Sequence, residues 1–546
     1  MGGRRLWYSS ASNPGAGNSM PSITKTRAWQ ALKAHREEIS RTTLRELFDA
    51  DPGRYQTFSY ETRGLALDLS KNRMTHRTLG LLAELAKAAG VEEQIEAMLS
   101  GQRINESEDR AARHMALRDR SELASAGVDA EVRSVDRRIE AFTNLVRAGR
   151  AVGATGKPFT DVLSIGIGGS HLGPMLVMTA LRTAETTGPK VHYVDNIDGH
   201  QIASTLAKLD PATTLVLAAS KSFTTMETLA NAETARKWIV ERLGRGAVAQ
   251  HFVGLTSNTA EARAFGITDD RIFPMWDWVG GRFSVWSAVG LSAALGVGWD
   301  AFSAFRAGAH AMDRHFAAEP LEENLPVLLA MTGIWNNNFL TFDDVAIVPY
   351  DERLRALPSF LQQLEMESNG KRVRLDGSVV DTRTAPVVFG MVGTSAQHTF
   401  HQLLHQGTRS VPVDFIAAAR PGHALSGRHD KLIANMLAQS EALAFGTDGG
   451  GDPHRTCPGN RPSTTILLEK LDPFHLGMLI ALYEHKVFVQ GVIWGINSFD
   501  QFGVELGKQL ADPLVRDISA SKVRGTYDSS TAGLLRRYRA WRGSDG

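Results

Sequence analysis

Residues 220–228 have the composition of a phosphate-binding turn. They read Ser-Lys-Ser-Phe-Thr-Thr-Met-Glu-Thr and stand between an expected strand and an expected helix. Ser220, Ser222 and Thr225 offer hydroxyl groups, Lys221 offers a cation, and the first turn of the helix offers free backbone amides. Ordinary N-capping by Ser or Thr would explain the same residues without a ligand. The segment therefore predicts an anion site, and the strength of this prediction depends on whether the other segments also suit a phosphorylated ligand.

Residues 164–170 form a glycine-rich turn between another expected strand and helix. They read Ser-Ile-Gly-Ile-Gly-Gly-Ser, which lets backbone amides approach an anion at the N-terminus of the helix. His171 stands where the dinucleotide fingerprint has its third glycine, and no Gly-Lys-Ser/Thr ending follows. These departures disfavour a nucleotide-dependent dehydrogenase, and a simple tight turn explains the loop about as well.

Residues 277–287 combine paired glycines with an arginine. Gly280 and Gly281 leave room for a ligand beside the backbone. Arg282 could meet an oxyanion with two parallel hydrogen bonds, although an arginine alone is more often a structural ion-pair partner.

Two further segments carry polar residues of interest, and His398 is a candidate for proton transfer. His398 follows a small-residue loop after an expected strand and is one of 17 histidines. Gln501 and Lys508 are seven positions apart with Glu505 between them, which predicts a single helix face. A lysine in such a place usually lies at the surface unless the helix faces a cleft.

Residues 362–371 read Gln-Gln-Leu-Glu-Met-Glu-Ser-Asn-Gly-Lys. Gln363 and Glu367 are four positions apart, so a helix places the carboxamide and the carboxylate on one face. Gly370 is a natural end for that helix. A single Glu on a helix is usually solvated, so this segment gains meaning only from the others.

Together, these six segments resemble the glucose-6-phosphate isomerase family. Residues 280–284 and 499–508 match the two diagnostic segments of that family, and the other segments match it in the same order, over about residues 24–533. The departures are small. Ser222 stands for a family threonine, Phe502 for a frequent tryptophan, and Gly495 for a frequent aspartate.

The resemblance implies an enzyme that interconverts glucose 6-phosphate and fructose 6-phosphate in glycolysis and gluconeogenesis. It assigns the base that moves a proton between C1 and C2 to Glu367 and charge stabilisation to Arg282. It assigns ring opening to His398 and Lys508. The substrate-binding residues that it implies are Ser170, Ser220, Lys221, Ser222, Thr225, Gly281, Gln363 and Gln501.

The family likeness also implies a homodimer in which His398 reaches the site of the neighbouring subunit, with no cofactor and no metal. Two alternatives stay open. A dual-specificity isomerase would also accept mannose 6-phosphate, and a non-catalytic sensor would bind the sugar phosphate without turnover.

Composition favours a soluble, cytoplasmic protein. Among 546 residues, 43% are hydrophobic and 22% are charged, and 60 basic side chains balance 59 acidic ones, which argues against a nucleic-acid partner. The single cysteine, Cys457, excludes a disulfide within the chain and suits a reducing compartment. The most apolar stretch, residues 474–496, is interrupted by Glu484, His485 and Lys486, so we expect a buried strand and helix rather than a membrane span.

The elements that must position these side chains alternate between short apolar runs and longer helical patterns. From residue 159 onward this alternation predicts an α/β fold with parallel sheets covered by helices on both faces. We expect two doubly wound subdomains of the sugar-isomerase type, each an α-β-α sandwich, with helical N- and C-terminal segments. Expected strands are 162–165, 191–194, 214–218, 251–255, 345–348, 387–390 and 411–416.

The chain length requires more than one domain. The predicted parts are a disordered leader (1–23), a helical segment (24–150), a first α/β subdomain (151–300), a second α/β subdomain (301–511) and a C-terminal tail helix (512–546).

Overall fold

The computed structural model describes residues 22–118, 128–520 and 523–543 of the chain. The chain divides after Ser498 into two compact units. The larger unit contains both β-sheets. The smaller unit contains helices α20 (Glu505–Ser519) and α21 (Ser529–Arg542).

The first sheet is parallel throughout and has the strand order β4-β3-β5-β6-β7. Its strands are β3 (Asp161–Ile165), β4 (Lys190–Val194), β5 (Thr214–Ala219), β6 (Phe252–Thr256) and β7 (Ile272–Pro274). Strand β5 is buried along its whole length, as expected for a strand with both faces covered.

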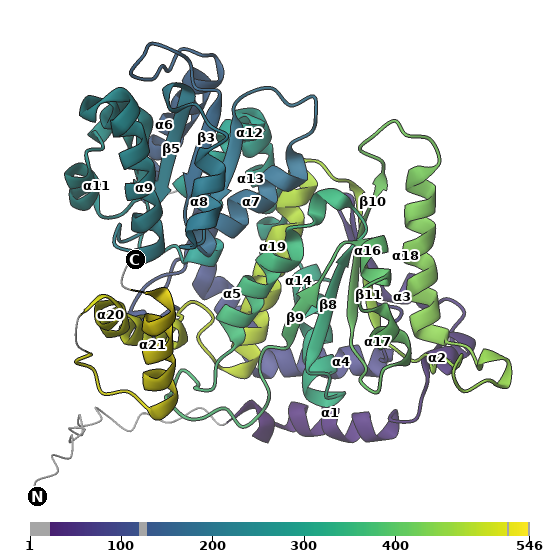
Figure 1. Cartoon of the computed structure of the whole chain (residues 1–546). Coiled ribbons are helices and arrows are strands. Elements are labelled where there is room, and N and C mark those ends of the chain that lie inside the picture. The colour runs from purple at the N-terminus through teal and green to yellow at the C-terminus, as the bar shows by residue number, and fades with distance from the viewer. Residues whose placement is uncertain (1–21, 119–127, 521–522, 544–546) are drawn as a thin grey trace, which may run out of the picture. The chain divides into compact units, whose positions relative to one another are not determined.

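Helices pack on both faces of this sheet (Figure 1). They are α6 (Val128–Arg147), α7 (Gly169–Leu181), α8 (Gly199–Leu206), α9 (Met226–Leu243), α10 (Val248–His251), α11 (Thr259–Phe265) and α12 (Leu291–Val297). Alternate strand residues such as Leu163 and Val216 join one core with Ile202 of α8 and Ile239 of α9. Helices α7 and α12 contact β4.

The second sheet is mixed and has the order β1-β2-β11-β10-β8-β9. Strands β8 (Asp344–Pro349), β9 (Val387–Gly390), β10 (Val413–Arg420) and β11 (Ser463–Lys470) are parallel. A hairpin of β1 (Ser59–Thr62) and β2 (Leu65–Asp68) adds to β11 in the antiparallel direction.

The second sheet is also covered on both faces. The remaining helices of the larger unit are α1 (Arg27–Glu38), α2 (Leu44–Ala50), α3 (Arg54–Phe58), α4 (His76–Ala88), α5 (Val91–Leu99), α13 (Trp299–Ala318), α14 (Leu325–Ile334), α15 (Leu357–Gln362), α16 (Gly393–Gln397), α17 (His401–Gln406), α18 (Arg428–Phe445) and α19 (Pro473–Trp494). Val348 and Phe415 share a core with Ala396 of α16, Leu404 of α17 and Met436 of α18. Figure 1 shows α19 beside α13 and α14, which it contacts.

Helix α19 is the core helix of the larger unit. By length and composition it could cross a membrane, but its apolar window is 94% buried inside the protein. Long apolar core helices have the same length and composition, so α19 alone is weak evidence for a membrane span. The apolar stretch that we expected to form a strand and a helix is one continuous helix.

The structure confirms the predicted α/β class with two helix-covered sheets. The β1–β2 hairpin was not expected, because the N-terminal segment reads as helical. The expected disordered leader lies outside the described residues except for Ser22 and Ile23. The boundary expected after residue 511 falls inside α20, and the other domain boundaries stay predictions.

Candidate functional site

The glycine-rich turn after β3 is a close-packed loop. Gly168 has φ of 56°, a conformation that only glycine adopts cheaply, and α7 begins at Gly169. A Cβ atom on Gly169 would lie 2.1 Å from the backbone carbon of Gly281, so this loop is pressed against the loop that carries Arg282. Ser170 is half-buried on the first turn of α7.

The hydroxyl-rich turn after β5 leads directly into α9. Thr225 is the N-cap residue, and its side chain makes no capping hydrogen bond. Its hydroxyl instead lies 3.0 Å from that of buried Ser220. The first-turn amides of α9 therefore have no side-chain cap and suit an anion. Phe223 is held at φ of 53°, which is strained for a bulky residue and bends the turn around this position.

Lys221 does not point its ammonium group freely into the turn. Its Nζ donates to the backbone oxygens of Asp277 at 3.1 Å and Val279 at 3.4 Å. Burial and the nearby charge of Arg110 lower its pKa. The lysine thus ties the hydroxyl-rich turn to the loop that carries Arg282, and Ser222 remains exposed.

These two turns follow the neighbouring strands β3 and β5. The chain passes from β3 to β4 on one side and then returns to β5 on the other side of β3. In open parallel sheets, ligands bind outside the carboxyl ends of the strands at this kind of reversal. The sheet topology therefore places both turns where a ligand is expected.

The predicted helix around Glu367 has an unexpected hydrogen-bond register. Residues Gln363–Glu367 form a π-helical turn directly after α15. Such turns are rare and occur frequently at functional sites. The helix ends before Gly370, as predicted, and this position requires glycine because a Cβ atom there would lie 2.3 Å from the carbonyl oxygen of Met366.

Arg282 and Glu367 meet at the end of this turn. Arg282 Nη1 lies 3.4 Å from Glu367 Oε2, with 1% of the arginine side chain and 21% of the glutamate side chain exposed. Arg282 also donates from Nε to Ser368 Oγ at 2.6 Å and from Nη2 to the backbone oxygen of Ser498 at 2.5 Å. The guanidinium is thereby fixed, while the carboxylate beside it can be reached from solvent.

Gln363 lies at the same place. A Cβ atom on Gly168 would be 3.0 Å from its Nε2, and its Oε1 is a buried acceptor without a hydrogen-bond partner. A buried polar atom without a partner calls for an explanation, and a bound hydroxyl group would supply one. The structure thus brings together the glycine-rich turn, the Gly281–Arg282 loop and the π-turn.

The remaining predicted residues lie on other elements of the chain. His398 follows α16, which packs on β8 and α18, and its side chain is exposed. Gln501 and Lys508 belong to the smaller unit. The expectation that they share a helix face is wrong, because Gln501 precedes a single 3₁₀ turn and only Lys508 lies on α20.

Sequence reasoning missed the residues that hold this group in place. Ser368 and Asn369 directly follow Glu367, and Ser498 ends the larger unit; their side chains are buried. Lys486 is also buried, on α19. The signal that could have identified Lys486 is its place beside Glu484 and His485 within an apolar helical stretch, where charged residues need buried partners. Within residues 22–118, 128–520 and 523–543, no three His, Cys, Asp or Glu side chains are grouped as metal ligands.

Comparison with known proteins gives consistent matches. The family model described as phosphoglucose isomerase matches residues 68–535. A glucose-6-phosphate isomerase 2 of Chromobacterium violaceum is 49% identical over 95% of this chain and 98% of that protein. A glucose-6-phosphate isomerase 1 of Thiobacillus denitrificans is 49% identical over 94% and 98%. The crystal structure of a glucose-6-phosphate isomerase from Chlamydia trachomatis has a TM-score of 0.85 at 34% identity and covers 95% of this chain and 100% of that one.

Proposed function

Because the chain belongs to the phosphoglucose isomerase family, we propose that it interconverts glucose 6-phosphate and fructose 6-phosphate in glycolysis and gluconeogenesis. The observation that carries this proposal is the Arg282–Glu367 pair, where a fixed cation stands 3.4 Å from an accessible carboxylate. An aldose–ketose isomerisation needs both, a base for a carbon-bound proton and a positive charge for the oxygen that becomes negative.

We assign the substrate phosphate to the turn after β5. Ser220, Ser222 and Thr225 would donate hydroxyl hydrogen bonds, and the first amides of α9 would add theirs. Lys221 would contribute through its backbone, since its ammonium group is engaged with the carbonyls of Asp277 and Val279. The negative phosphate would then sit at the positive end of an 18-residue helix.

In the open-chain aldose, Glu367 would take the proton from C2, and the electron pair of the broken C–H bond would form the C1–C2 double bond of the enediolate. The electron pair of the C1 carbonyl would pass to O1, which becomes the oxyanion. Returning the proton from Glu367 to C1, while the hydroxyl proton on O2 passes to O1 and the C2 carbonyl forms, would give the ketose. Arg282 would stabilise the oxyanion, because its position is already fixed by Ser368 and Ser498 and needs no rearrangement. The unpaired Oε1 of Gln363 would accept a hydrogen bond from a sugar hydroxyl.

Ring opening needs a second acid–base pair, which we assign to His398 and Lys508. Ser170, Gly281 and Gln501 would line the pocket. The exposed position of His398 beyond α16 suits a residue that completes the site of a neighbouring subunit, so we propose a homodimer with shared sites. No cofactor or metal enters this mechanism.

We further propose a cytoplasmic location without membrane or nucleic-acid partners. The single cysteine, the balance of 60 basic and 59 acidic side chains and the burial of α19 support it.

A coupled assay tests the reaction. Purified protein with EDTA should form glucose 6-phosphate from fructose 6-phosphate and leave mannose 6-phosphate unchanged. Turnover of mannose 6-phosphate would favour a dual-specificity isomerase. Absence of turnover by folded protein that still binds fructose 6-phosphate would favour a sensor and sink the isomerase assignment.

Subunit mixing tests the shared site. Glu367→Gln and His398→Ala proteins should each be inactive, and exchange between them should restore one working site per mixed dimer. Exchange that is proven by mass spectrometry but restores no turnover would contradict a contribution of His398 from the partner.

A further inference from the structure

Helix α19 carries three consecutive ionisable residues in the core of the larger unit. Glu484, His485 and Lys486 have 1%, 0% and 7% of their surface exposed. Burying charged groups is costly unless they are paired, and an apolar helix would pack without that cost. Successive residues of a helix point about 100° apart, so the three side chains meet three different neighbours. One neighbour, Trp286, follows Arg282 in the same loop, and another, Glu365, lies in the π-turn that ends with Glu367.

Lys486 meets the π-turn that ends with Glu367. Its Nζ donates to Glu365 Oε2 at 2.6 Å, and the side chains of both residues are almost fully buried. Gln490, one turn further along α19, lies against the same carboxylate, and turning its amide group by 180° brings its nitrogen to donate to Glu365 Oε1 at 3.0 Å. Glu365 precedes Glu367 by two positions, within the same π-turn. The register of this turn is therefore anchored to α19.

A continuous chain of hydrogen bonds links the same anchor to Arg282. Asn369 donates to the backbone oxygen of Val487 on α19 at 2.9 Å and accepts from Ser498 Oγ at 2.7 Å. The backbone oxygen of Ser498 and the hydroxyl of Ser368 in turn receive the two hydrogen bonds of Arg282. Moving the π-turn would thus move the supports of the arginine as well.

Glu484 meets the loop of Arg282 from the other side. Trp286, four positions after Arg282, donates its Nε1 to Glu484 Oε1 at 2.9 Å. Arg118 donates to the other carboxylate oxygen at 2.6 Å. The ring of Phe283 stacks on that of His114 at 4.7 Å, which adds a second contact behind the same loop.

We propose that Glu484 and Lys486 are positioning residues, which from one turn of α19 hold the Arg282 loop and the Glu367 turn at their working separation. This inference rests on the proposed isomerase function. It adds two residues that act through Trp286 and Glu365 and touch no substrate.

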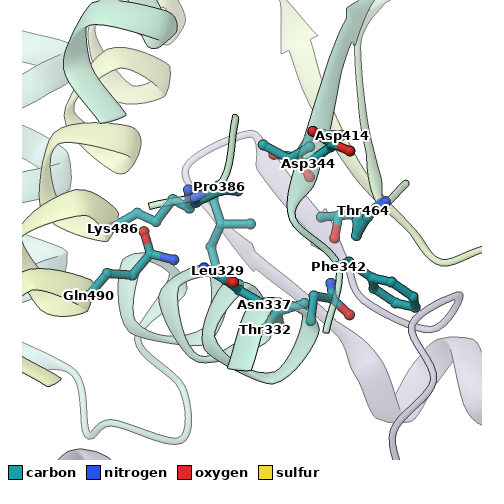
Figure 2. A pocket seen from close by; sticks show the side chains of 14 residues that line it. Leu329, Thr332, Asn337, Phe342, Asp344, Pro386, Asp414, Thr464, Lys486 and Gln490 are labelled. Carbon is teal, nitrogen blue, oxygen red and sulfur yellow. The ribbon is translucent and has the colours of Figure 1, made fainter. Parts of the chain in front are cut away.

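The cavity beside Lys486 supports an indirect role. Figure 2 shows Lys486 and Gln490 reaching from α19 toward this cavity, with Asp414 across it. The space open to water centres is about 30 Å³, enough for about two waters and too small for a sugar phosphate. Asp414 has its own partner, since Tyr483 donates to it at 2.9 Å, so Glu365 is the carboxylate that Lys486 holds directly.

The experiment compares Lys486→Met, the double variant Glu365→Leu/Lys486→Met and the full-length wild type. The matched control is Lys237→Met/Glu241→Leu, which removes an exposed Lys–Glu pair on α9 that is 3.8 Å apart. Each protein is assayed for kcat and KM, for the isotope effect with glucose 6-phosphate deuterated at C2, and for its melting temperature.

Lys486→Met should lower kcat by about 10- to 100-fold, because small misplacements of catalytic groups have effects of that size. KM should stay within about threefold, and the isotope effect should rise because proton abstraction becomes slower. The double variant should recover the melting temperature, since removing both charges leaves none unpaired, but should not recover kcat. Glu484→Gln should also lower kcat, by a smaller factor, with little change in KM and a larger isotope effect. The control variant should have the kcat, KM and melting temperature of the wild type.

Two results would overturn the proposal. One is a Lys486→Met protein with wild-type kcat and isotope effect. The other is a double variant in which kcat returns together with the melting temperature, because the pair would then act on stability alone. A crystal structure of Lys486→Met gives a test that needs no turnover. Its Arg282 Nη1–Glu367 Oε2 distance should exceed the present 3.4 Å, and an unchanged distance would contradict the positioning role even if the isomerase assignment failed.

Discussion

The larger unit contains two buried arginines that meet carboxylates in opposite ways. Arg118 makes a two-pronged contact with Asp313, at 2.7 Å for each bond, and a third bond of 2.6 Å with Glu484, and these carboxylate side chains are at most 6% exposed. Arg282 faces Glu367 at 3.4 Å, and that carboxylate is 21% exposed. The first arrangement is saturated and closed, as suits a core. The second leaves a carboxylate beside a fixed cation and open to a substrate.

The largest effect should follow from removing the open carboxylate. Glu367→Gln keeps the shape of the side chain but cannot take a proton, so kcat should fall by about 10²–10⁴-fold. Binding of fructose 6-phosphate, measured by calorimetry, should persist. The exposed Glu241→Gln on α9 is the control and should keep full activity. Near-normal turnover of Glu367→Gln would remove this residue from the mechanism.

Changing the cation of the open pair should have the next largest effect. Arg282→Lys retains the charge but loses the fork that holds Ser368 and Ser498, so the ammonium group is displaced from the developing oxyanion. We expect a loss of about 10²-fold in kcat and a smaller change in KM, from steady-state kinetics. A rise in KM without a change in kcat would instead make Arg282 a binding residue.

Substitutions in the closed cluster of Arg118, Asp313 and Glu484 should lower the stability of the protein. Arg118→Met leaves two buried carboxylates without their cation, which should lower the free energy of unfolding by about 3–5 kcal/mol in denaturant titrations. Arg103→Met removes an exposed pair with Asp109 of similar length and should change it by less than about 1 kcal/mol. Equal effects of the two substitutions would contradict the contrast between the arginines.

The smallest expected effect concerns the pH dependence of stability. Burial raises the pKa of the Glu484 carboxyl to about 7 from its ordinary 4.5, against the attraction of Arg118 and the hydrogen bond of Trp286. Because the folded protein holds this proton more tightly than the unfolded chain, protonated Glu484 stabilises the fold. This contribution is fully present below pH 4.5, the ordinary pKa, and is lost as the pH rises through about 7, the folded-state pKa. The melting temperature should therefore fall between pH 5 and pH 8, and Glu484→Gln should flatten this dependence. An equally steep fall in the variant would exclude Glu484 as its source.

Local pattern was sufficient for much of the fold. The segments that form β3, β5 and β8 are short, largely apolar runs bounded by turns. Such runs indicate buried strands even when their packing partners are unknown. Strand β11 was not predicted, although it begins at the last residue of the Gly/Pro-rich stretch 446–463. The β1–β2 hairpin is too short to stand out from the helical pattern around it, and its partner lies far away in the chain.

The candidate site could be predicted where its residues lie in compact motifs. Residues 280–284 and 362–371 gave Arg282 and Glu367, which the structure brings together. The π-turn could not be predicted, because residues 363–367 also fit an ordinary α-helix and their residue types do not specify i→i+5 hydrogen bonds. The Glu365–Lys486 pair joins residues that are 121 positions apart, so only the packing of α19 against the π-turn reveals it.

The β1–β2 hairpin has a consequence for how the chain is made. Leu65 of β2 pairs with Leu468 of β11, about 400 residues later. At about 5–20 residues per second, a ribosome needs roughly 20–80 s to add that partner strand. During this time the hairpin has an unpaired edge that another chain could join. Completion of the second sheet must therefore wait until most of the protein has been synthesised.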